Sequence, residues 1–372
     1  MGKNHRLHPV LGIILLALCL FSWGCRTGIG PRLVARDRFD YNQQIIRSSN
    51  EQMLLNLVRL HYNDIPLFLE LGSVVVQFGI EGRASAGGSF NLNSPQGDQG
   101  VLDLGVSYAE RPTIVYEPLQ GEEFATRLLS PIPHETLVLL AQTGWSVERL
   151  MLMCVQRIND ISNAPTATGP TPEDKPDYEE FAKLAGLLRR LQRAGLFEMN
   201  WEPEASNRII RFWLASPSGP LDPYREDLAA VRKMLGLPEK QTEFTMTDFP
   251  FKRQPNQVGM RGRTMLGVLF YLSHAVESPE AHTKAGLVVQ TKDEYGKPFD
   301  WTKVMEKILK IRVHSEKPPD AYVSAKYRGY WFSIADSDRN SKATFSLLSY
   351  IISLQTARAK GKSPLLTLPV GQ

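Results

Sequence analysis

The first part of the chain carries hydrophobic positions at helical spacing. Between residues 36 and 64 these positions are Phe39, Ile45 or Ile46, Met53, Leu57 and Leu60. The pattern predicts one long helix, or two helices separated near Ser48. Pro66 follows the last of these positions and is expected to stop the helix.

From Leu69 the hydrophobic period changes to that of strands. The run from residue 69 to 93 is interrupted by glycines at 82, 87 and 88, and two more strand-like runs follow between residues 100 and 118. Glycine-interrupted runs of this kind predict hairpins of short strands. We therefore expect a small antiparallel β region after the N-terminal helical region. The glycines lack the spacing of a nucleotide-binding loop, so we interpret them as turns.

The middle of the chain returns to helical periodicity. Residues 134–160 predict two helices, with Gly144 closing the first and Ser146 capping the second. Residues 178–215 predict a helix followed by two strands around the turn "PEASN". Further on, residues 223–237 predict a helix, residues 242–249 alternate like an edge strand, and residues 259–278 predict an apolar helix.

The C-terminal part has the most regular pattern. Three strand-like runs, "ILKIRVHSE", "AYVSAKYR" and "GYWFSIAD", are separated by prolines and a glycine and precede an amphipathic helix over residues 337–359. This order predicts an antiparallel sheet covered by a helix. The fold class we expect is α+β, with an N-terminal helical and small antiparallel β region and a C-terminal antiparallel sheet with packed helices.

A proline-rich segment divides these two regions. "NAPTATGPTPEDKP", residues 163–176, contains four prolines and no bulky apolar residue, which is typical of an exposed linker or long loop. We therefore predict a signal peptide at 1–24, a tether at 25–36, an N-terminal domain at 37–162, a linker at 163–176 and a C-terminal domain at 177–372.

The N-terminus has the layout of an export signal. Lys3 and Arg6 precede an uncharged, mostly apolar run from Val10 to Trp23, which ends at Gly24 and Cys25. The strongly apolar core covers residues 10–21, which is short of the ~20 residues that span a bilayer as a helix.

The end of this run resembles the lipobox of bacterial lipoproteins. In that family a small residue precedes an obligatory cysteine, which is diacylated on sulfur before the signal is removed. Gly24 and Cys25 match this pattern, whereas Ser22 stands where the family usually has leucine and Trp23 where it prefers a small residue. The resemblance implies a mature protein that begins at Cys25 and is held on membrane lipid by its acyl chains. The alternatives are an uncleaved N-terminal anchor, or cleavage elsewhere and release.

The residue after Cys25 helps to predict which membrane the lipoprotein would reach. Residue 26 is Arg rather than the Asp that, by resemblance to enterobacterial lipoproteins, retains a protein at the inner membrane. This favours the periplasmic face of the outer membrane.

Charge and cysteine content narrow the function classes. The formal charge of +4 falls to +2 without Lys3 and Arg6, which is too near neutral to indicate a nucleic-acid partner. The arginines of residues 189–211 are interpreted in the same way, as solvated charges. Cys154 would be the one thiol left beside Cys25 after signal removal, and its apolar neighbours predict a buried packing residue.

No catalytic or metal-binding motif stands out in the body. The histidines after the signal, His61, His134, His274, His282 and His314, have no zinc spacing, so no metal or cofactor is predicted. We interpret His274 as a residue favourably placed to cap a helix C-terminus, rather than as a metal ligand. The polar cluster best placed to bind a ligand joins a strand end to a helix start and consists of Asp336, Asp338, Arg339 and Lys342. Helix capping and surface charge explain the same residues.

Two functional hypotheses remain. The first is a non-enzymatic envelope lipoprotein, anchored through Cys25, whose body contacts other envelope proteins. The second is a periplasmic enzyme, of hydrolase type, whose site forms only in three dimensions. A compact pocket with perturbed titratable groups would favour the enzyme, and an exposed strand edge would favour the interaction protein.

Overall fold

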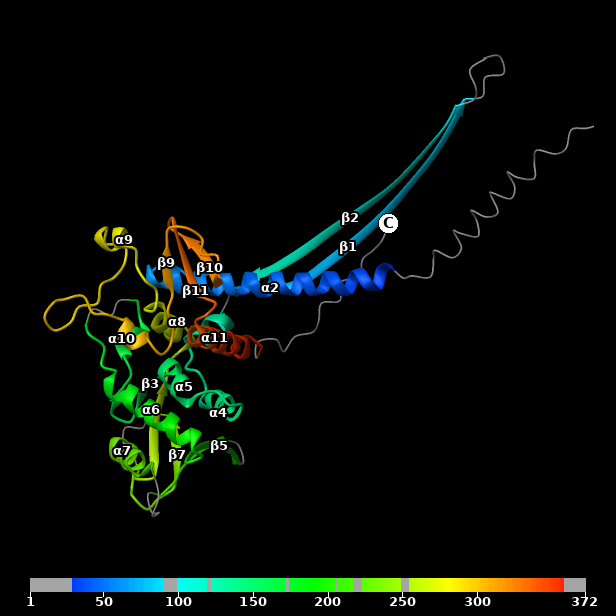
Figure 1. Cartoon of the computed structure of the whole chain (residues 1–372). Coiled ribbons are helices and arrows are strands. Elements are labelled where there is room, and N and C mark those ends of the chain that lie inside the picture. Colours follow the sequence, from blue (N-terminus) through cyan, green and yellow to red (C-terminus); the bar gives the residue numbers. More distant parts are fainter. Residues whose placement is uncertain are drawn as a thin grey trace, which may run out of the picture.

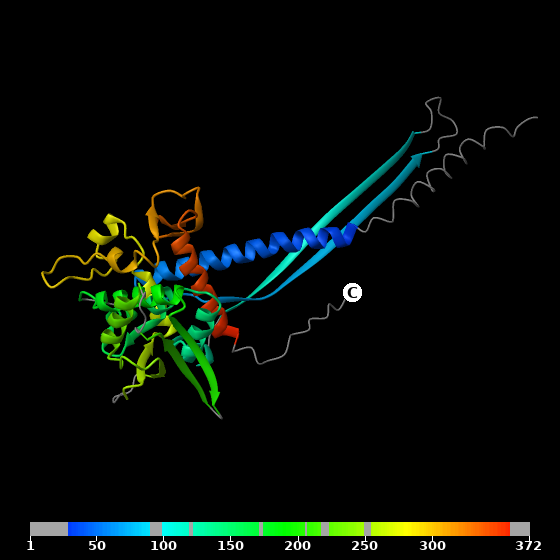
Figure 2. The same cartoon turned by 60° about the horizontal axis from the view of Figure 1, so that its bottom comes forward.

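Two arms project from one side of a folded body (Figure 1). The computed structural model describes residues 29–89, 99–118, 122–170, 174–204, 207–216, 223–248 and 254–357. One arm is helix α2 (Ile29–His61), and the other is the hairpin of β1 (Leu69–Ser89) and β2 (Gln99–Pro118). Both arms run outward in the same general direction in both views (Figures 1 and 2).

Helix α2 is continuous through Ser48, so the prediction of one long helix is confirmed and the division into two is wrong. Its C-terminal part is buried in the body, with Leu54, Leu57 and Val58 fully inaccessible. Towards the N-terminus, Phe39 and Ile46 are mostly exposed. The body therefore holds the last turns of α2, and residues 29–50 form a helical arm outside it.

The β region is one long hairpin, so the prediction of several short hairpins is wrong. Its antiparallel register runs without interruption from Ser73↔Val115 to Ser89↔Gln99, with a single irregularity between Leu71 and Ser73. The glycines that suggested turns remain in the ladder, as in Gly88↔Gly100. Glycine weakens a strand but keeps both of its backbone hydrogen-bonding groups, so it does not end the pairing.

Three short helices enter the body after the hairpin. These are α3 (Glu122–Leu129), α4 (His134–Gln142) and α5 (Val147–Cys154). The prediction for α4 and α5 is confirmed at their junction, where the Ser146 hydroxyl accepts a hydrogen bond from the backbone N–H of Arg149 at 3.5 Å. The second helix stops earlier than predicted, because the chain continues directly into strands β3 (Val155–Ile158) and β4 (Ile161–Ser162).

A six-stranded mixed sheet forms the lower part of the body in Figure 1. Its order is β4-β3-β8-β7-β6-β5, with β5 (Phe197–Glu204), β6 (Asn207–Leu214), β7 (Glu243–Asp248) and β8 (Gln257–Gly262). Helices α6 (Glu179–Arg193) and α7 (Arg225–Leu235) lie where the sequence predicts them.

Two predictions within this sheet are wrong. Strand β7 is internal rather than an edge, because it pairs with β6 on one side and in parallel with β8 on the other. The start of the expected apolar helix is strand β8, and helix α8 (Met265–Ser273) begins only after the Thr264 cap. Glycines at 259 and 262 and a hydroxyl cap at 264 explain why the helix starts late.

The C-terminal prediction is confirmed. A three-stranded antiparallel sheet has the order β10-β11-β9, with β9 (Arg312–His314), β10 (Ala321–Tyr327) and β11 (Tyr330–Ala335), followed by helix α11 (Arg339–Ala357). Short elements η2 (Pro165–Thr168), α9 (Glu280–Lys284) and α10 (Thr302–Met305) complete the body. The chain is an α+β protein.

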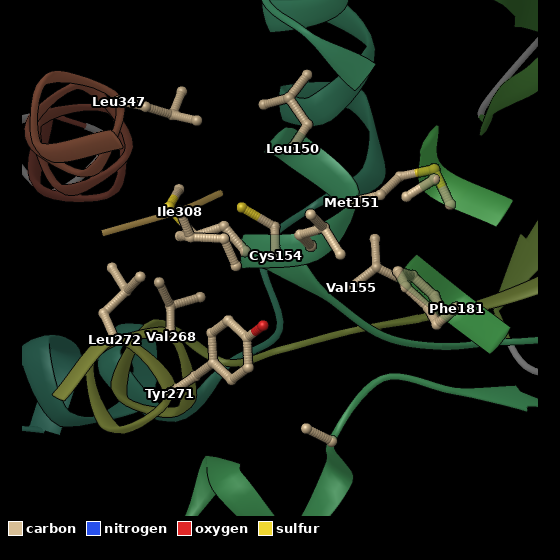
Figure 3. Close-up of a cluster of buried hydrophobic side chains, with 14 of the residues drawn as sticks. Leu150, Met151, Cys154, Val155, Phe181, Val268, Tyr271, Leu272, Ile308 and Leu347 are labelled. Atoms are coloured by element: carbon tan, nitrogen blue, oxygen red, sulfur yellow. The ribbon is translucent and has the colours of Figure 1, made fainter. Parts of the chain in front are cut away.

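One connected hydrophobic core runs through the body, from Leu54 in α2 to Ile351 in α11. Figure 3 shows part of it, where α5, α8, α11 and Ile308 meet around Cys154. Cys154 is fully buried, as predicted, and burial raises the pKa of its thiol to about 12, which keeps it protonated and unreactive.

The proline-rich segment is not fully exposed. Asn163, Ala164 and Ala167 are buried, so the prediction of an exposed linker is wrong for its first half. The Asn163 side-chain amide donates to the carbonyls of Leu152 at 3.0 Å and Val155 at 2.7 Å. These bonds attach the segment to the junction of α5 and β3. No helix in the described ranges is long and apolar enough to cross a membrane.

Candidate functional site

The predicted ligand-binding cluster forms the start of helix α11. The Asp338 carboxylate accepts hydrogen bonds from the backbone N–H of Ser341 at 3.0 Å and from its hydroxyl at 2.7 Å. Burial alone would raise the pKa of Asp338, but these bonds and one from the backbone of Asn340 outweigh it and hold the pKa below its usual value. Asp338 therefore caps the helix.

The other members of this cluster contact one another or solvent. Lys342 Nζ lies 2.6 Å from Asp336 Oδ1 and 4.9 Å from the centre of the Tyr322 ring. Arg339 is exposed. The structure thus brings Asp336 and Lys342 together as an ion pair, and ligand binding by the cluster stays a prediction. Cys25 lies outside the described residues.

A second arrangement, which the sequence did not predict, is a pocket of about 510 Å³ between the end of α2 and the loops around α10. His61, His274, Ser278 and Trp301 line it together with glutamates, threonines and an arginine. His61 Nε2 lies 2.7 Å from Ser278 Oγ. The His274 ring stacks on Trp301 with 4.1 Å between ring centres and 11° between ring planes.

Both pocket histidines are neutral at neutral pH. Burial lowers the pKa of His61 to about 4, against the opposing effect of a hydrogen bond with the backbone of Ser273. Burial also lowers the pKa of His274 to about 3, with a further contribution from His61. His274 is the C-cap residue of helix α8, as predicted, and its buried ring is uncharged at neutral pH.

The contact between His61 and Ser278 has the geometry of a histidine base beside a serine hydroxyl. If the backbone bond of His61 uses one ring N–H, the other ring nitrogen is free to accept the Ser278 hydroxyl proton, which is how a serine nucleophile is activated. A pKa near 4 makes His61 a weak base for that step. The two residues are 217 positions apart, so no local motif could have revealed the pair.

A third cluster lies at the base of the arms, where α2 ends. Tyr327 donates a hydrogen bond to the Asp64 carboxylate at 2.5 Å, and Arg328 makes an ion pair with the same oxygen at 2.8 Å. The Tyr327 hydrogen bond and the Arg328 charge lower the pKa of Asp64. Tyr62 donates to or accepts from His282 Nδ1 at 2.7 Å and packs against Tyr327. These contacts join the end of α2 to strand β10 and to α9.

Metal binding has no support in the described ranges, where no group of three or more histidine, cysteine or carboxylate side chains is arranged to hold an ion. No protein-family model, curated protein or solved structure matches this chain. The function must therefore be inferred from the chain's own geometry.

Proposed function

We propose that this chain is a lipid-anchored protein of the bacterial cell envelope, with a structural or interaction role rather than an enzymatic one. The observation that carries the proposal is the placement of the arms. Helix α2 begins at Ile29, only four residues after Cys25, and its first turns are the part farthest from the body (Figure 1). A lipid at Cys25 would therefore hold the far end of the helical arm at the membrane.

The dimensions support this role. A helix of 33 residues is about 50 Å long. Because the body holds only the last turns, a lipid-anchored α2 would separate the body from the membrane surface by tens of ångströms. The helical arm exposes Phe39 and Ile46, and in the described ranges neither outer edge of the hairpin pairs with a third strand; these are surfaces for protein partners in the envelope. Lipid anchoring at the periplasmic face of the outer membrane fits Arg26.

The intact mass of the protein extracted from membranes of a bacterial host tests the anchor. We expect the mass of residues 25–372 plus acyl chains, and we expect Cys25→Ala to lose both the acyl mass and the processing. Cys19→Ala is the matched control, because Cys19 belongs to the segment that is removed and its substitution should leave the lipid in place. An unmodified full-length mass for the wild-type protein would contradict lipidation.

The pair of His61 and Ser278 supports a second candidate, a serine-dependent hydrolase. The supporting observation is the 2.7 Å contact within a pocket large enough for a small substrate. A fluorophosphonate, which modifies activated serines, should then add its mass at Ser278, and Ser278→Ala should abolish the addition. The control is Ser333→Ala, because Ser333 also contacts a histidine, His314 at 2.9 Å, but does not line the pocket. Absence of labelling in the wild-type protein would contradict this candidate.

A further inference from the structure

The hairpin arm has two chemically different faces. In an antiparallel pair, directly opposed residues share a face and neighbouring residues along a strand lie on opposite faces. The register places Ile80 opposite Tyr108, Ala84 opposite Leu104 and Gly88 opposite Gly100. The face defined by these pairs, which we call face A, carries in its outer half only positions 80, 82, 84, 86, 88, 100, 102, 104, 106 and 108.

Charge is completely segregated between the two faces in this outer half. Face A has isoleucine, alanine, leucine, valine, glycine and one tyrosine at its ten positions, and none is charged. The opposite face, face B, carries the three charged residues found within the paired residues 80–89 and 99–108, which are Glu81, Arg83 and Asp103, together with serine, glutamine, glycine and one valine. Such strict alternation is typical of a strand with one apolar and one aqueous side.

The length of this pattern matches a lipid bilayer. A strand that crosses the hydrocarbon layer needs about 9–11 residues. The uncharged stretch of face A covers residues 80–88 on β1 and residues 100–108 on β2, which is nine residues on each strand. Towards the body the next face A pair is Phe78 opposite Glu110, so the uncharged stretch ends at nine residues, which is the lower end of the length that the bilayer requires.

The body leaves the hairpin without a covering. In the described part of the chain, β1 and β2 form a sheet of two strands, and neither outer edge is paired with a third strand. An isolated two-stranded hairpin is at best marginally stable in water. The apolar face and the backbone N–H and C=O groups of the two edges therefore both need partners. In a membrane interior water cannot hydrogen-bond these backbone groups, so other strands must do so.

The hairpin also projects towards the side of the body where the proposed lipid anchor would place the membrane. It projects on the same side of the body as the helical arm, and its far end lies beyond the start of α2 in both views (Figures 1 and 2). With about 20 residues in each strand, it is more than ~60 Å long and exceeds the length of α2. A chain anchored through a lipid near Ile29 would bring the outer half of the hairpin into the same membrane.

We propose that the outer half of the hairpin inserts into the lipid bilayer as part of an assembly of several copies of this chain, which pair edge to edge. Face A contacts the acyl chains, and face B faces the aqueous interior of the ring-shaped assembly. Neighbouring copies satisfy the edge hydrogen bonds, because each copy supplies one free edge of β1 and one of β2. The choice of lipid as the medium rests on the proposed membrane anchoring.

Single cysteines on the two faces test the insertion. The full chain, isolated from host membranes, is reconstituted into vesicles of phosphatidylethanolamine with a minor share of phosphatidylglycerol. Ala84→Cys on face A and Ser85→Cys on face B are each labelled with an environment-sensitive dye, and the parent protein sets the background. We expect quenching of the dye at residue 84 by nitroxide lipids, and quenching at residue 85 by aqueous iodide. Equal accessibility of both positions to iodide would overturn the proposal.

A matched pair of carboxylate substitutions tests the assembly. Ala84→Asp places a charge on face A, and we expect at least a tenfold loss of protein recovered as membrane-inserted oligomers after chemical cross-linking. Ser85→Asp places the same charge on face B and should stay within about twofold of the parent. Equal effects of the two substitutions, or monomers only for the parent, would contradict the proposal. A blue-shifted dye at residue 84 without vesicles would show a protein covering instead and would also overturn it.

Failure of the hairpin proposal can be distinguished from failure of the proposed lipid anchor at Cys25. Both experiments are repeated with Cys25→Ala protein added to the same vesicles. If the mass measurement shows no lipid but residue 84 still meets nitroxide lipids, the hairpin proposal stands and the anchoring fails. If the lipid is present but residues 84 and 85 respond alike, the anchoring stands and the hairpin proposal fails.

Discussion

The body and the arms differ in how their polar and apolar groups are matched: the body surrounds a buried guanidinium with carbonyls of its own, whereas the arms expose apolar side chains and strand edges. The fully buried Arg263 donates to the carbonyls of Leu152, Met153 and Val155 at 2.9–3.2 Å and to that of Asn163. Among the residues that the structure describes, no third strand pairs with either outer edge of the hairpin, and the helical arm exposes Phe39 and Ile46. If the proposals above hold, the body folds without the arms, and the arms become stable in contact with a membrane or with other copies of the chain.

The largest expected effect concerns pH and the body. Burial holds the pKa values of His61 and His274 near 4 and 3, below the ordinary value of 6.5. The unfolded chain therefore binds protons that the folded chain does not, and stability is lost as the pH falls below 6.5. Each histidine contributes a loss of ~1.4 kcal/mol per pH unit, which is roughly 3 kcal/mol for His61 by pH 4.

Denaturant titrations between pH 8 and pH 4 measure this loss. His274→Phe keeps a ring to stack on Trp301 and should make the free energy of unfolding less dependent on pH below 6.5. Above pH 7 the substitution removes no titration, so its effect there serves as the control. An unchanged slope in the variant would show that His274 takes up a proton in the folded state and contradict its burial.

The next effect concerns the buried guanidinium. Burial lowers the pKa of Arg263 to about 10, so the group is charged at neutral pH while it hydrogen-bonds four carbonyls and stacks on Tyr271 at 3.9 Å. Arg263→Leu leaves these buried carbonyls without a donor, and we expect a loss of about 3–4 kcal/mol in the free energy of unfolding.

Arg261→Leu is the control for this loss, because Arg261 lies only two residues before Arg263, in strand β8, but is exposed. Its effect should stay within about 0.5 kcal/mol. Similar losses in both variants, measured by denaturant titration, would contradict a special role for the buried arginine.

A smaller effect is expected where the arms join the body. Tyr327→Phe removes the hydroxyl that donates to Asp64, and we expect a loss of about 1 kcal/mol, because both partners are partly solvated. Since the bond lowers the pKa of Asp64, this contribution is present above pH 3.8 and disappears as the pH falls through the lowered pKa. Faster hydrogen exchange at the end of α2 in the variant would confirm the role, and unchanged exchange would contradict it.

The smallest expected effect is that of a substitution in the hairpin arm on the stability of the body. Ala84→Asp alters the outer half of the hairpin, whose strands pair with each other and not with the sheets of the body. We expect the thermal unfolding midpoint of the body to change by less than about 1 °C in detergent solution. A larger shift would show that the hairpin contributes to the core and would remove the distinction between arms and body.

The sequence patterns predict helices and strands better than they predict how these elements pair and pack. The stripe of Phe181, Leu184 and Leu188 identified α6, and the alternating runs near the C-terminus identified β10 and β11, because each pattern records a single buried face. The 69–118 region also showed strand periodicity. The prediction of turns at its glycines is wrong, since periodicity alone does not distinguish a glycine at a turn from a glycine within a paired strand.

The candidate sites show the same limit. The Asp338 cap follows from a short local sequence, so the sequence predicts helix capping there as an alternative to ligand binding. The contact of His61 with Ser278 and that of Tyr327 with Asp64 join residues more than 200 positions apart. Only the packing of α2 against the C-terminal half creates them, so no spacing rule within the sequence could indicate either one.

Hydrogen–deuterium exchange of the full-length protein, in detergent solution and in vesicles, tests the contrast between body and arms most directly. We predict that backbone amides of the body, such as those of α5 and α8, have the same protection in both media. The amides of residues 80–88 and 100–108 should gain strong protection only in vesicles. Equal protection of the hairpin in both media, or none in vesicles, would contradict the account.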